Sequence, residues 1–491
     1  MEFKADIGLE VHVQLKTRSK MFTRAPYHYG AEPNTLTDPV VLALPGVLPV
    51  MNEEAVHKTV QLGLLCKCEI AERCKWDRKN YFYPDSPKNY QLSQFDQPIC
   101  IGGEVEIEML GASRNVMGEH RKVQLTRIHL EEDVGKLTHF TQDSLVDYNR
   151  AGAPLCEIVT EPDLHNADEV FAFLTALRNN IVAAGLSDCD MEKGQMRCDA
   201  NISVRPLDQE ELGTKVELKN MNTISGVRNA VAYEIKRQIH AVVSGETITQ
   251  QTRRWDPVTH VTTKMRDKEE SHDYRYFPDP DLMPVTISAE LKEELAKELP
   301  ELPFDRQRRY METLELPYTI TSVLCPDREL AEFFEAALAA TEGKGTAKAV
   351  ANLMVNELLR ELSAGEQEGS LPLSACKVTP SHIAELVVLT EQGVITKQIG
   401  KEVFIEMYQT GKLPAASIEE KDLRSEQGDD GELEGIIREV ATDPKHEKAI
   451  AQFKEGNKKA INSLIGPIMK ATQGKADPRK IQELLAKVLS S

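Results

Sequence analysis

The sequence predicts an α+β protein in which an antiparallel sheet comes first and a mainly helical region follows. Two observations support this fold class. Short segments of alternating apolar and polar residues recur from the N-terminus to about residue 290, between loops rich in Pro, Gly, Asn and Asp. Beyond that point apolar residues recur at helical spacing, and proline or glycine marks the ends of the segments.

The bulk composition sets the class of protein. The chain has 491 residues, of which 41% are hydrophobic and 28% charged, enough for a sizeable core and roughly two to four domains. No run approaches the roughly 20 apolar residues of a membrane span, and the first residues lack a signal-peptide pattern. We therefore expect a cytoplasmic protein. The nine cysteines include no C-x-x-C pair, so we expect neither a disulfide framework nor a zinc ribbon.

Helical segments define the expected domains. One helix is expected early, from Asp168 to Ala184, because Asn166 can cap its start and Gly185 follows its end. Later helices are expected at 291–299, 328–341, 347–363, 380–391 and 396–409. The predicted organisation is a sheet domain at 1–290, a helical domain at 291–410, a polar acidic linker at 411–431 and a helical tail domain at 432–491.

Charge is distributed unevenly along the chain. A net charge of −19 is unfavourable for a nucleic-acid binder taken as a whole. Charge acts within a screening length of about 8 Å, however, so its local density matters more than the sum. From Lys445 to the C-terminus there are ten Lys and Arg residues against four acids. The tail is therefore a basic block in an acidic protein.

The first strand carries a polar face. Residues 7–15 alternate, with apolar odd-numbered positions and Glu10, His12 and Gln14 at the even ones. Side chains two apart on a strand are separated by roughly 6.6 Å at the backbone, so Glu10 and His12 could converge on one ion. A solvated polar face is the simpler interpretation of this strand taken alone.

A second polar face makes a functional interpretation stronger. Residues 197–205 alternate apolar positions with Arg197, Asp199, Asn201 and further polar residues, and residues 215–219 place charges opposite apolar neighbours. We expect the two segments to form an antiparallel hairpin with a charged face.

A third strand ends in three consecutive carboxylates. Alternation puts Glu131 in phase with His129, and Glu132 in phase with the apolar Leu130. Periodicity does not decide which acid faces a site. Carboxylates, an imidazole and an amide suit Mg²⁺ held partly through water. Because Mg²⁺ rarely takes histidine directly, His12 would bind an outer water or a softer ion.

Two loops, at 76–90 and 273–281, mix bases with aromatic residues. In them Lys79, Lys88 and Arg275 could meet phosphate, while tyrosines such as Tyr81 stack or donate hydrogen bonds. Packed surface loops with extended lysine stems are the alternative. The chain has no G-x-x-x-x-G-K-[ST] loop, no G-x-S-x-G motif and no cysteine in a catalytic context. Any nucleotide would bind outside the P-loop scheme, and an amide donor would be hydrolysed elsewhere.

Over nearly its whole length the sequence resembles the B subunits of the tRNA-dependent amidotransferases. The motifs that carry the resemblance occur in order along the chain, at 7–12 (IGLEVH), 77–85 (DRKNYFYPD), 90–98 (YQLSQFDQP), 129–136 (HLEEDVGK), 196–203 (MRCDANIS), 217–220 (ELKN), 273–278 (DYRYFP) and 466–471 (GPIMKA).

The resemblance implies a fold and an activity. The fold would be a cradle-shaped catalytic domain, a helical domain and a small tail domain that engages tRNA. The protein would act with an A subunit, the glutaminase, and a C subunit. Using ATP and Mg²⁺, it would phosphorylate the side-chain carboxylate of mischarged Asp-tRNA(Asn) or Glu-tRNA(Gln), and ammonia from glutamine would displace the phosphate. A non-catalytic tRNA-binding scaffold of the same ancestry is the alternative.

The resemblance also implies roles for individual residues. The metal-binding group would be Glu10, His12, Glu132 and Asp199, with Glu131, Asn201 and Arg275 as supporting or alternative residues. Lys79, Tyr81 and Lys88 would line the phosphate site or the ammonia path. In the tail, the tRNA-binding residues would be Lys454, Lys458, Lys459 and Lys470. Many members carry a C-x-x-C zinc pair where this chain has Asp38 and Val41, so we expect no structural zinc.

Overall fold

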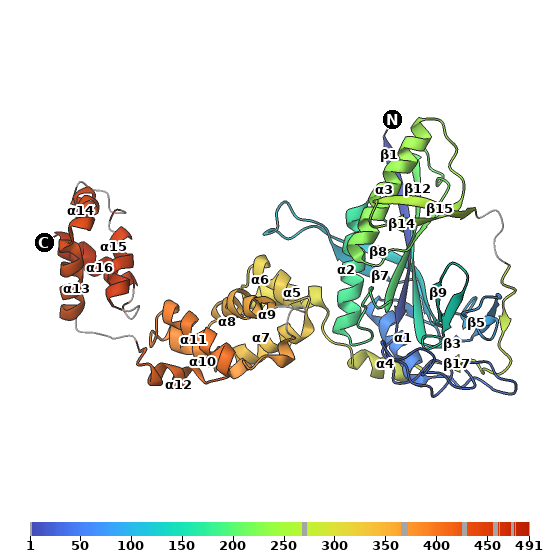
Figure 1. The fold of residues 1–491 in the computed structure, drawn as a ribbon, viewed down its shortest axis with the longest axis horizontal. Coiled ribbons are helices and arrows are strands. Elements are labelled where there is room, and N and C mark those ends of the chain that lie inside the picture. The colour runs from blue at the N-terminus through green and yellow to red at the C-terminus, as the bar shows by residue number, and fades with distance from the viewer. Residues whose placement is uncertain are drawn as a thin grey trace. The chain divides into compact units, whose positions relative to one another are not determined.

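The computed structural model of the protein describes residues 2–267, 273–364, 372–424, 430–454, 460, 462–472, 476 and 478–490. The chain forms two compact units, Met1–Pro303 and Phe304–Ser491. The first is built on β-sheets with helices packed against them, and in the second the described elements are helical (Figure 1). The predicted α+β class is confirmed.

A ten-stranded sheet organises the first unit. Its order is β15 (Val261–Asp267), β14 (Gln251–Asp256), β13 (Val216–Lys219), β12 (Met196–Pro206), β1 (Phe3–Gln14), β11 (Pro154–Thr160), β8 (His120–Glu132), β6 (Cys100–Ile101) and β2 (Glu69–Ile70), and β7 (Glu104–Glu108) pairs with β8 beside this path. Neighbouring strands are antiparallel except β13 and β14, which are parallel. The predicted hairpin of β12 and β13 is confirmed.

Three smaller sheets lie in the same unit. They are β16 (Phe277–Pro278), β4 (Asp77–Asn80) and β5 (Tyr90–Ser93); β17 (Val285–Thr286) and β3 (Arg73–Cys74); and β10 (Ser144–Asp147) and β9 (Lys136–His139). In the first of these, β16 pairs with β4. This pairing joins the two segments, far apart in the sequence, that mix bases with aromatic residues.

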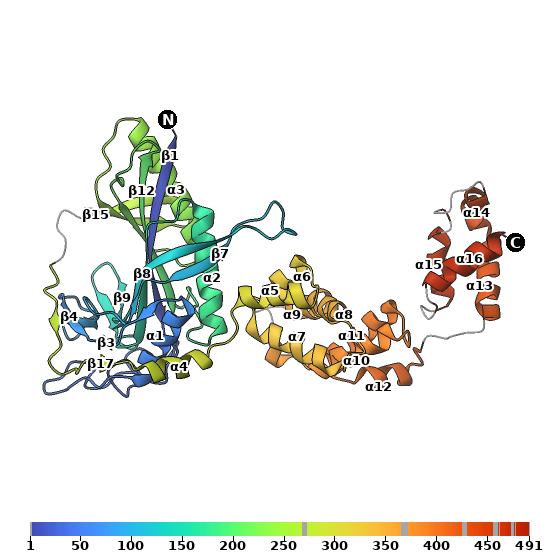
Figure 2. The same ribbon diagram turned by 180° about the vertical axis from the view of Figure 1, so that it is seen from behind.

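Helices cover the apolar face of the large sheet. They are α1 (Glu53–Leu65), α2 (Ala167–Ala183) and α3 (Ile224–Val243), and α4 (Ala289–Lys297) packs against α1. Thr59 of α1 contacts Cys156 of β11, Oγ1 to Sγ 3.3 Å. In both views α2 and α3 lie on one side of the sheet while β9 lies on the other (Figures 1 and 2). These helices therefore leave the opposite, polar face of the sheet uncovered.

Sequence reasoning anticipated α2 but missed α1 and α3. Both begin at ordinary cap residues, Asn52 and Thr223, whose side chains accept backbone hydrogen bonds. Their β-branched residues and mixed polarity weakened the helical signal in a region dominated by strands.

The second unit contains the helices expected between residues 328 and 409 and in the tail, together with three that were not expected, at 303–313, 318–324 and 414–420; the helix expected at 291–299 lies in the first unit. The helices of the second unit are α5 (Pro303–Thr313), α6 (Tyr318–Leu324), α7 (Arg328–Ala340), α8 (Ala347–Leu353), α9 (Leu359–Ala364), α10 (Pro380–Glu391), α11 (Lys397–Thr410), α12 (Pro414–Glu420), α13 (Asp430–Thr442), α14 (Glu447–Lys454), α15 (Asn462–Ala471) and α16 (Pro478–Ser490). A π-helical turn, Met354–Leu358, joins α8 to α9. None of the helices described is long and apolar enough to cross a membrane.

Two apolar cores stabilise this unit. The larger gathers buried residues from Tyr310 to Ile418, and the smaller gathers residues from Ile437 to Leu485. Within the stretch predicted as a linker, α12 contributes Ile418 to the larger core. Pro414 begins this helix at a position that proline favours.

Candidate metal and phosphate site

A row of polar side chains crosses four strands of the large sheet. In the strand register His12 of β1 lies opposite Arg197 of β12 and Glu157 of β11, and Glu157 lies opposite His129 of β8. Residues directly opposite one another share a face of the sheet. The four side chains therefore stand on the polar face, away from α1.

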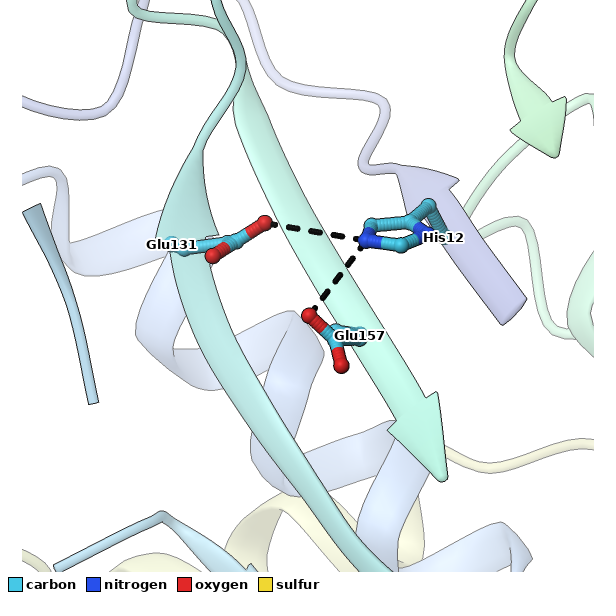
Figure 3. A group of neighbouring side chains, drawn as sticks. All are labelled: His12, Glu131 and Glu157. Carbon is cyan, nitrogen blue, oxygen red and sulfur yellow. Dashed lines mark ion pairs between the residues drawn. The ribbon is translucent and has the colours of Figure 1, made fainter. Parts of the chain in front are cut away.

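Three of the polar side chains converge. His12 Nε2 lies 3.3 Å from Glu157 Oε2 and 3.9 Å from Glu131 Oε1, and Figure 3 shows the three side chains pointing toward one another from β1, β11 and β8. One ligand atom from each residue lies within 4.8 Å of the other two. Within the described part of the chain, these three residues form the one group of His, Cys, Asp and Glu side chains whose spacing suits a metal ion.

Burial and charge oppose each other in this group. Burial lowers the pKa of His12, but its hydrogen bond to Glu157 and the charges of Glu157 and Glu131 outweigh burial and raise it. His129 Nε2 lies 3.4 Å from Glu157 Oε2, and the same carboxylates raise the pKa of His129 to about 9 against the effect of burial. Burial raises the pKa of Glu157, but the two imidazoles outweigh it and hold that pKa well below the usual value. Protons on the imidazoles thus balance the carboxylates where no cation does so.

Lys79 and a group of tyrosines adjoin the trio. Burial lowers the pKa of Lys79, but the charges of Glu131 and Glu157 and the nearby tyrosines Tyr274 and Tyr276 raise that pKa above the usual value. The Lys79 ammonium lies 5.0 Å from the centre of the Tyr274 ring, and Tyr81 meets that ring edge to face at 6.3 Å. Burial and nearby carboxylates, Glu131 among them, also raise the pKa of Tyr81. Both predicted residues therefore lie within electrostatic range of Glu131.

Lys88 lies at a different place. Its ammonium forms an ion pair with Glu132, and the Leu92 backbone N–H donates to the same carboxylate oxygen at 3.0 Å. Lys88 and Glu132 line a pocket together with Phe22, Asp85 and other residues. Since successive side chains on a strand point to opposite faces, Glu131 and Glu132 serve two separate environments.

Glu10 and Asp199 form a neighbouring polar row. They lie opposite each other in the strand register. Asn201 Nδ2 donates to Glu10 Oε1 at 2.8 Å. Asp199 forms an ion pair with Lys219, whose ammonium also lies 3.3 Å from Glu217. The two acids share the face of the trio, each with a hydrogen-bonding partner of its own.

Of the predicted group Glu10, His12, Glu132 and Asp199, the structure thus brings only His12 into the converging trio, with Glu131 and Glu157. Sequence reasoning did not single out Glu157. Its signal was available: it is the one charged residue of β11, whose sequence is PLCEIVT.

The remaining predicted residues lie apart from the trio. Arg275 is exposed and pairs with Asp273, Nε to Oδ2 3.4 Å. Lys470 is exposed in the last turn of α15. Lys458 and Lys459 lie outside the described residues, as does the side chain of Lys454. Asp38 accepts hydrogen bonds from the Thr23 hydroxyl and from the Val41 backbone N–H, the latter at 2.8 Å.

The fold and its polar face define an α+β protein with a carboxylate–imidazole site of the kind that holds a divalent cation, beside a lysine suited to phosphate. Comparison with known proteins identifies the family. A model of the GatB/GatE catalytic domain matches residues 5–293, and a model of the GatB domain matches residues 332–489. The chain belongs to the GatB family, the B subunits of tRNA-dependent amidotransferases.

Curated relatives match from end to end. A protein of Opitutus terrae is 56% identical over 491 residues, covering 100% of both chains. A protein of Carboxydothermus hydrogenoformans is 46% identical over 99% of this chain and 98% of its own, and one of Methylacidiphilum infernorum is 45% identical over 100% and 99%. Each of the three carries the name of the B subunit of an aspartyl/glutamyl-tRNA(Asn/Gln) amidotransferase.

Proposed function

We propose that this chain is the kinase and transamidation subunit of a cytoplasmic heterotrimeric amidotransferase. With ATP and Mg²⁺ it activates the side-chain carboxylate of Glu-tRNA(Gln) or Asp-tRNA(Asn), and with ammonia it forms the amide. An A subunit supplies the ammonia from glutamine, and a C subunit completes the assembly. The overall reaction is ATP-dependent carbon–nitrogen ligation. The proposal extends family membership to a mechanism.

The observation that carries the proposal is the trio of His12, Glu131 and Glu157. Glu131 Oε2 is buried and accepts no hydrogen bond from the described residues. A buried carboxylate oxygen without a donor is costly unless positive charge lies near it, and His129 Nε2 lies 3.9 Å from this oxygen. The donor set of two carboxylates and one imidazole fits a divalent cation, which Glu131, Glu157 and His12 would hold.

The reaction needs two displacements on this face. An oxygen of the substrate carboxylate attacks the γ-phosphorus of ATP, and ADP leaves. The nitrogen of ammonia then attacks the acyl carbon, the C–O bond to phosphate breaks, and a proton passes from the ammonia to the departing phosphate. Mg²⁺, when bound, supplies charge neutralisation to the phosphates.

The chain's own side chains have defined tasks in this scheme. Lys79 presents an ammonium beside Glu131, where it can bind a phosphate oxygen as a point charge. Tyr81 remains a phenol and can donate a hydrogen bond in the same region. The pocket at Lys88 and Glu132 is the proposed end of the ammonia path, because both polar groups lie there beside apolar walls.

The test uses the full complex with the A and C subunits. Glu131→Gln and Glu157→Gln should each lower ATP-dependent phosphate release and amide formation on Glu-tRNA(Gln) at least a hundredfold, while glutamine hydrolysis by the A subunit persists. The matched control is Glu161→Gln, an exposed acid just beyond β11 whose carboxylate accepts only from Thr126 among the described contacts. Undiminished phosphate release in both site variants would favour the non-catalytic scaffold.

A further inference from the structure

We infer that Arg197 is an oxyanion-binding residue that holds either the transferred phosphoryl group of ATP or the side-chain carboxylate of the mischarged amino acid. The inference rests on the proposed function and names the group that recognises its anionic substrate. Nothing in the family comparison assigns this residue a role.

Arg197 stands beside the trio. It lies opposite His12 in the register of β12 and β1, and its side chain is 35% exposed. Its positive charge lowers the pKa of His12, while the charges of Glu131 and Asp199 help to raise the pKa of Arg197. The guanidinium is therefore within electrostatic range of the carboxylates on both polar rows.

A buried carboxylate holds the guanidinium in place. Arg197 Nη2 donates a hydrogen bond to Asp133 Oδ2 at 2.9 Å, and Asp133 is only 3% exposed. Gln14 Nε2 donates to the same oxygen at 2.7 Å, and the Val134 backbone N–H donates to Oδ1 at 2.9 Å. Tyr27 in turn donates to Gln14 Oε1 at 2.9 Å, which fixes the orientation of that amide. The side of the guanidinium turned to Asp133 is thus firmly anchored.

A second guanidinium flanks the Asp133 carboxylate. Arg150 Nε lies 3.6 Å from Asp133 Oδ1. The anchor is therefore a charged one, which favours a fixed arginine geometry.

Most donors of Arg197 are left over. A guanidinium carries five N–H donors in a planar fork. Among the described residues, the Arg197 guanidinium donates one hydrogen bond, to Asp133. A planar fork matches the paired oxygens of a phosphate or a carboxylate, whereas an ammonium does not. The polar face is otherwise rich in acids, which repel an anionic substrate. Arg197 supplies positive charge where that substrate must approach the trio.

Arg205, eight positions along the same strand and on the same face, provides the contrast. Its guanidinium is anchored in the same way, with Nε donating to the buried Asp6 at 2.7 Å. Its other donors are occupied, however, by the carbonyl oxygens of Gln209 and Glu210, the latter at 3.1 Å. Arg205 therefore has a structural role. Arg197 is anchored in the same way by a buried carboxylate, but the other N–H donors of its guanidinium have no acceptor among the described residues.

The test compares Arg197→Met, Arg197→Lys and the matched control Arg205→Met in the complete complex. We expect Arg197→Met to lower kcat for ATP-dependent amidation about a hundredfold or more, as removal of a transition-state donor does. Arg197→Lys should recover part of that loss, because it keeps the charge but not the fork. Arg205→Met should keep kcat within about twofold of wild type.

Equilibrium binding separates the two ligands. Weaker binding of a non-hydrolysable ATP analogue to Arg197→Met, with KM for Glu-tRNA(Gln) unchanged, assigns the site to the phosphoryl group. A raised KM for Glu-tRNA(Gln) with unchanged binding of the analogue assigns it to the substrate carboxylate. Wild-type kcat and binding in a folded Arg197→Met complex would overturn the inference, as would a loss of thermal stability with no change in kinetics.

Two further outcomes are distinguishable. If Arg197→Met does not assemble, Arg197→Lys carries the test, and wild-type kinetics in that variant would overturn recognition by a fork. If the wild-type complex itself forms no amide with ATP, the proposed function fails, and weaker binding of the ATP analogue to Arg197→Lys than to Arg205→Met would still support an oxyanion site.

Discussion

Replacing Glu157 by glutamine removes one of the two carboxylates in the trio while keeping the size of the side chain. One oxygen of Glu157 and one of Glu131 lie within 4.8 Å of each other. Two negative charges at that separation repel each other by about 3.5 kcal/mol at an effective dielectric constant of about 20. A divalent cation offsets this repulsion, and the metal-free protein relies on the imidazoles of His12 and His129 instead.

Glu157→Gln therefore has two opposing effects on cation binding. It removes the attraction of one carboxylate for the cation, and it also removes the repulsion that cation binding relieves. We expect the first effect to exceed the second by about 1.4–2.8 kcal/mol, which is a ten- to hundredfold weaker affinity.

The assay is a titration of the nucleotide-free complex with Mn²⁺, a paramagnetic substitute for Mg²⁺, followed by the signal of the free ion. Glu131→Gln should behave like Glu157→Gln, and Glu161→Gln should bind as wild type does. Glu132→Gln distinguishes the two assignments, because the family resemblance implies Glu132 as a ligand whereas the structure pairs it with Lys88. Wild-type Mn²⁺ affinity in Glu157→Gln together with a weakened Glu132→Gln would refute the trio as the cation site.

Three further predictions concern other parts of the chain. Burial lowers the pKa of Lys20 from 10.5 to about 8. Between these values the unfolded chain binds more protons than the folded one, so the free energy of unfolding should rise with pH across that window. In urea unfolding at pH 7.5 and 9.5, Lys20→Met should show a smaller rise in the free energy of unfolding than wild type, and an equal rise would contradict the prediction. Lys88→Met should reduce amidation with glutamine at least tenfold but amidation with ammonium chloride less than threefold, and equal losses would remove the pocket from the ammonia path. Deleting the residues after 424 should weaken tRNA binding and flatten its salt dependence, and unchanged values would exclude the basic tail as a docking surface.

Sequence patterns predicted the fold class and most of the second unit. Helices α7, α10 and α11 begin and end within about one residue of the predicted positions, because capping threonines or aspartate and terminal glycines mark them. The hairpin of β12 and β13 was predicted from alternation alone. Local signals suffice where a segment's partners are its neighbours in sequence.

The site was only partly predictable because it depends on pairing between distant strands. Alternation shows that His12 and Glu131 each face one side of a strand, but not that β11 lies between β1 and β8. That order places Glu157 between His12 and His129. The anchor of Arg197 likewise joins residues 64 positions apart. Register between distant strands is a property of the folded sheet, so the chemistry of this face was visible in the sequence but its partners were not.

The three consecutive acids at the end of β8 show how one short segment can serve three environments. Glu131 points toward His12 and is part of the trio. Its neighbour Glu132 alternates to the opposite face and pairs with Lys88. Asp133 follows the last residue of β8, two positions after Glu131, and accepts from Arg197 on the same polar face. A substitution that shifted β8 by one residue would exchange the two faces and disturb all three contacts together. Consequently the spacing between cation site, pocket and oxyanion residue is fixed by backbone register rather than by flexible side chains, as reactions that depend on positioning require.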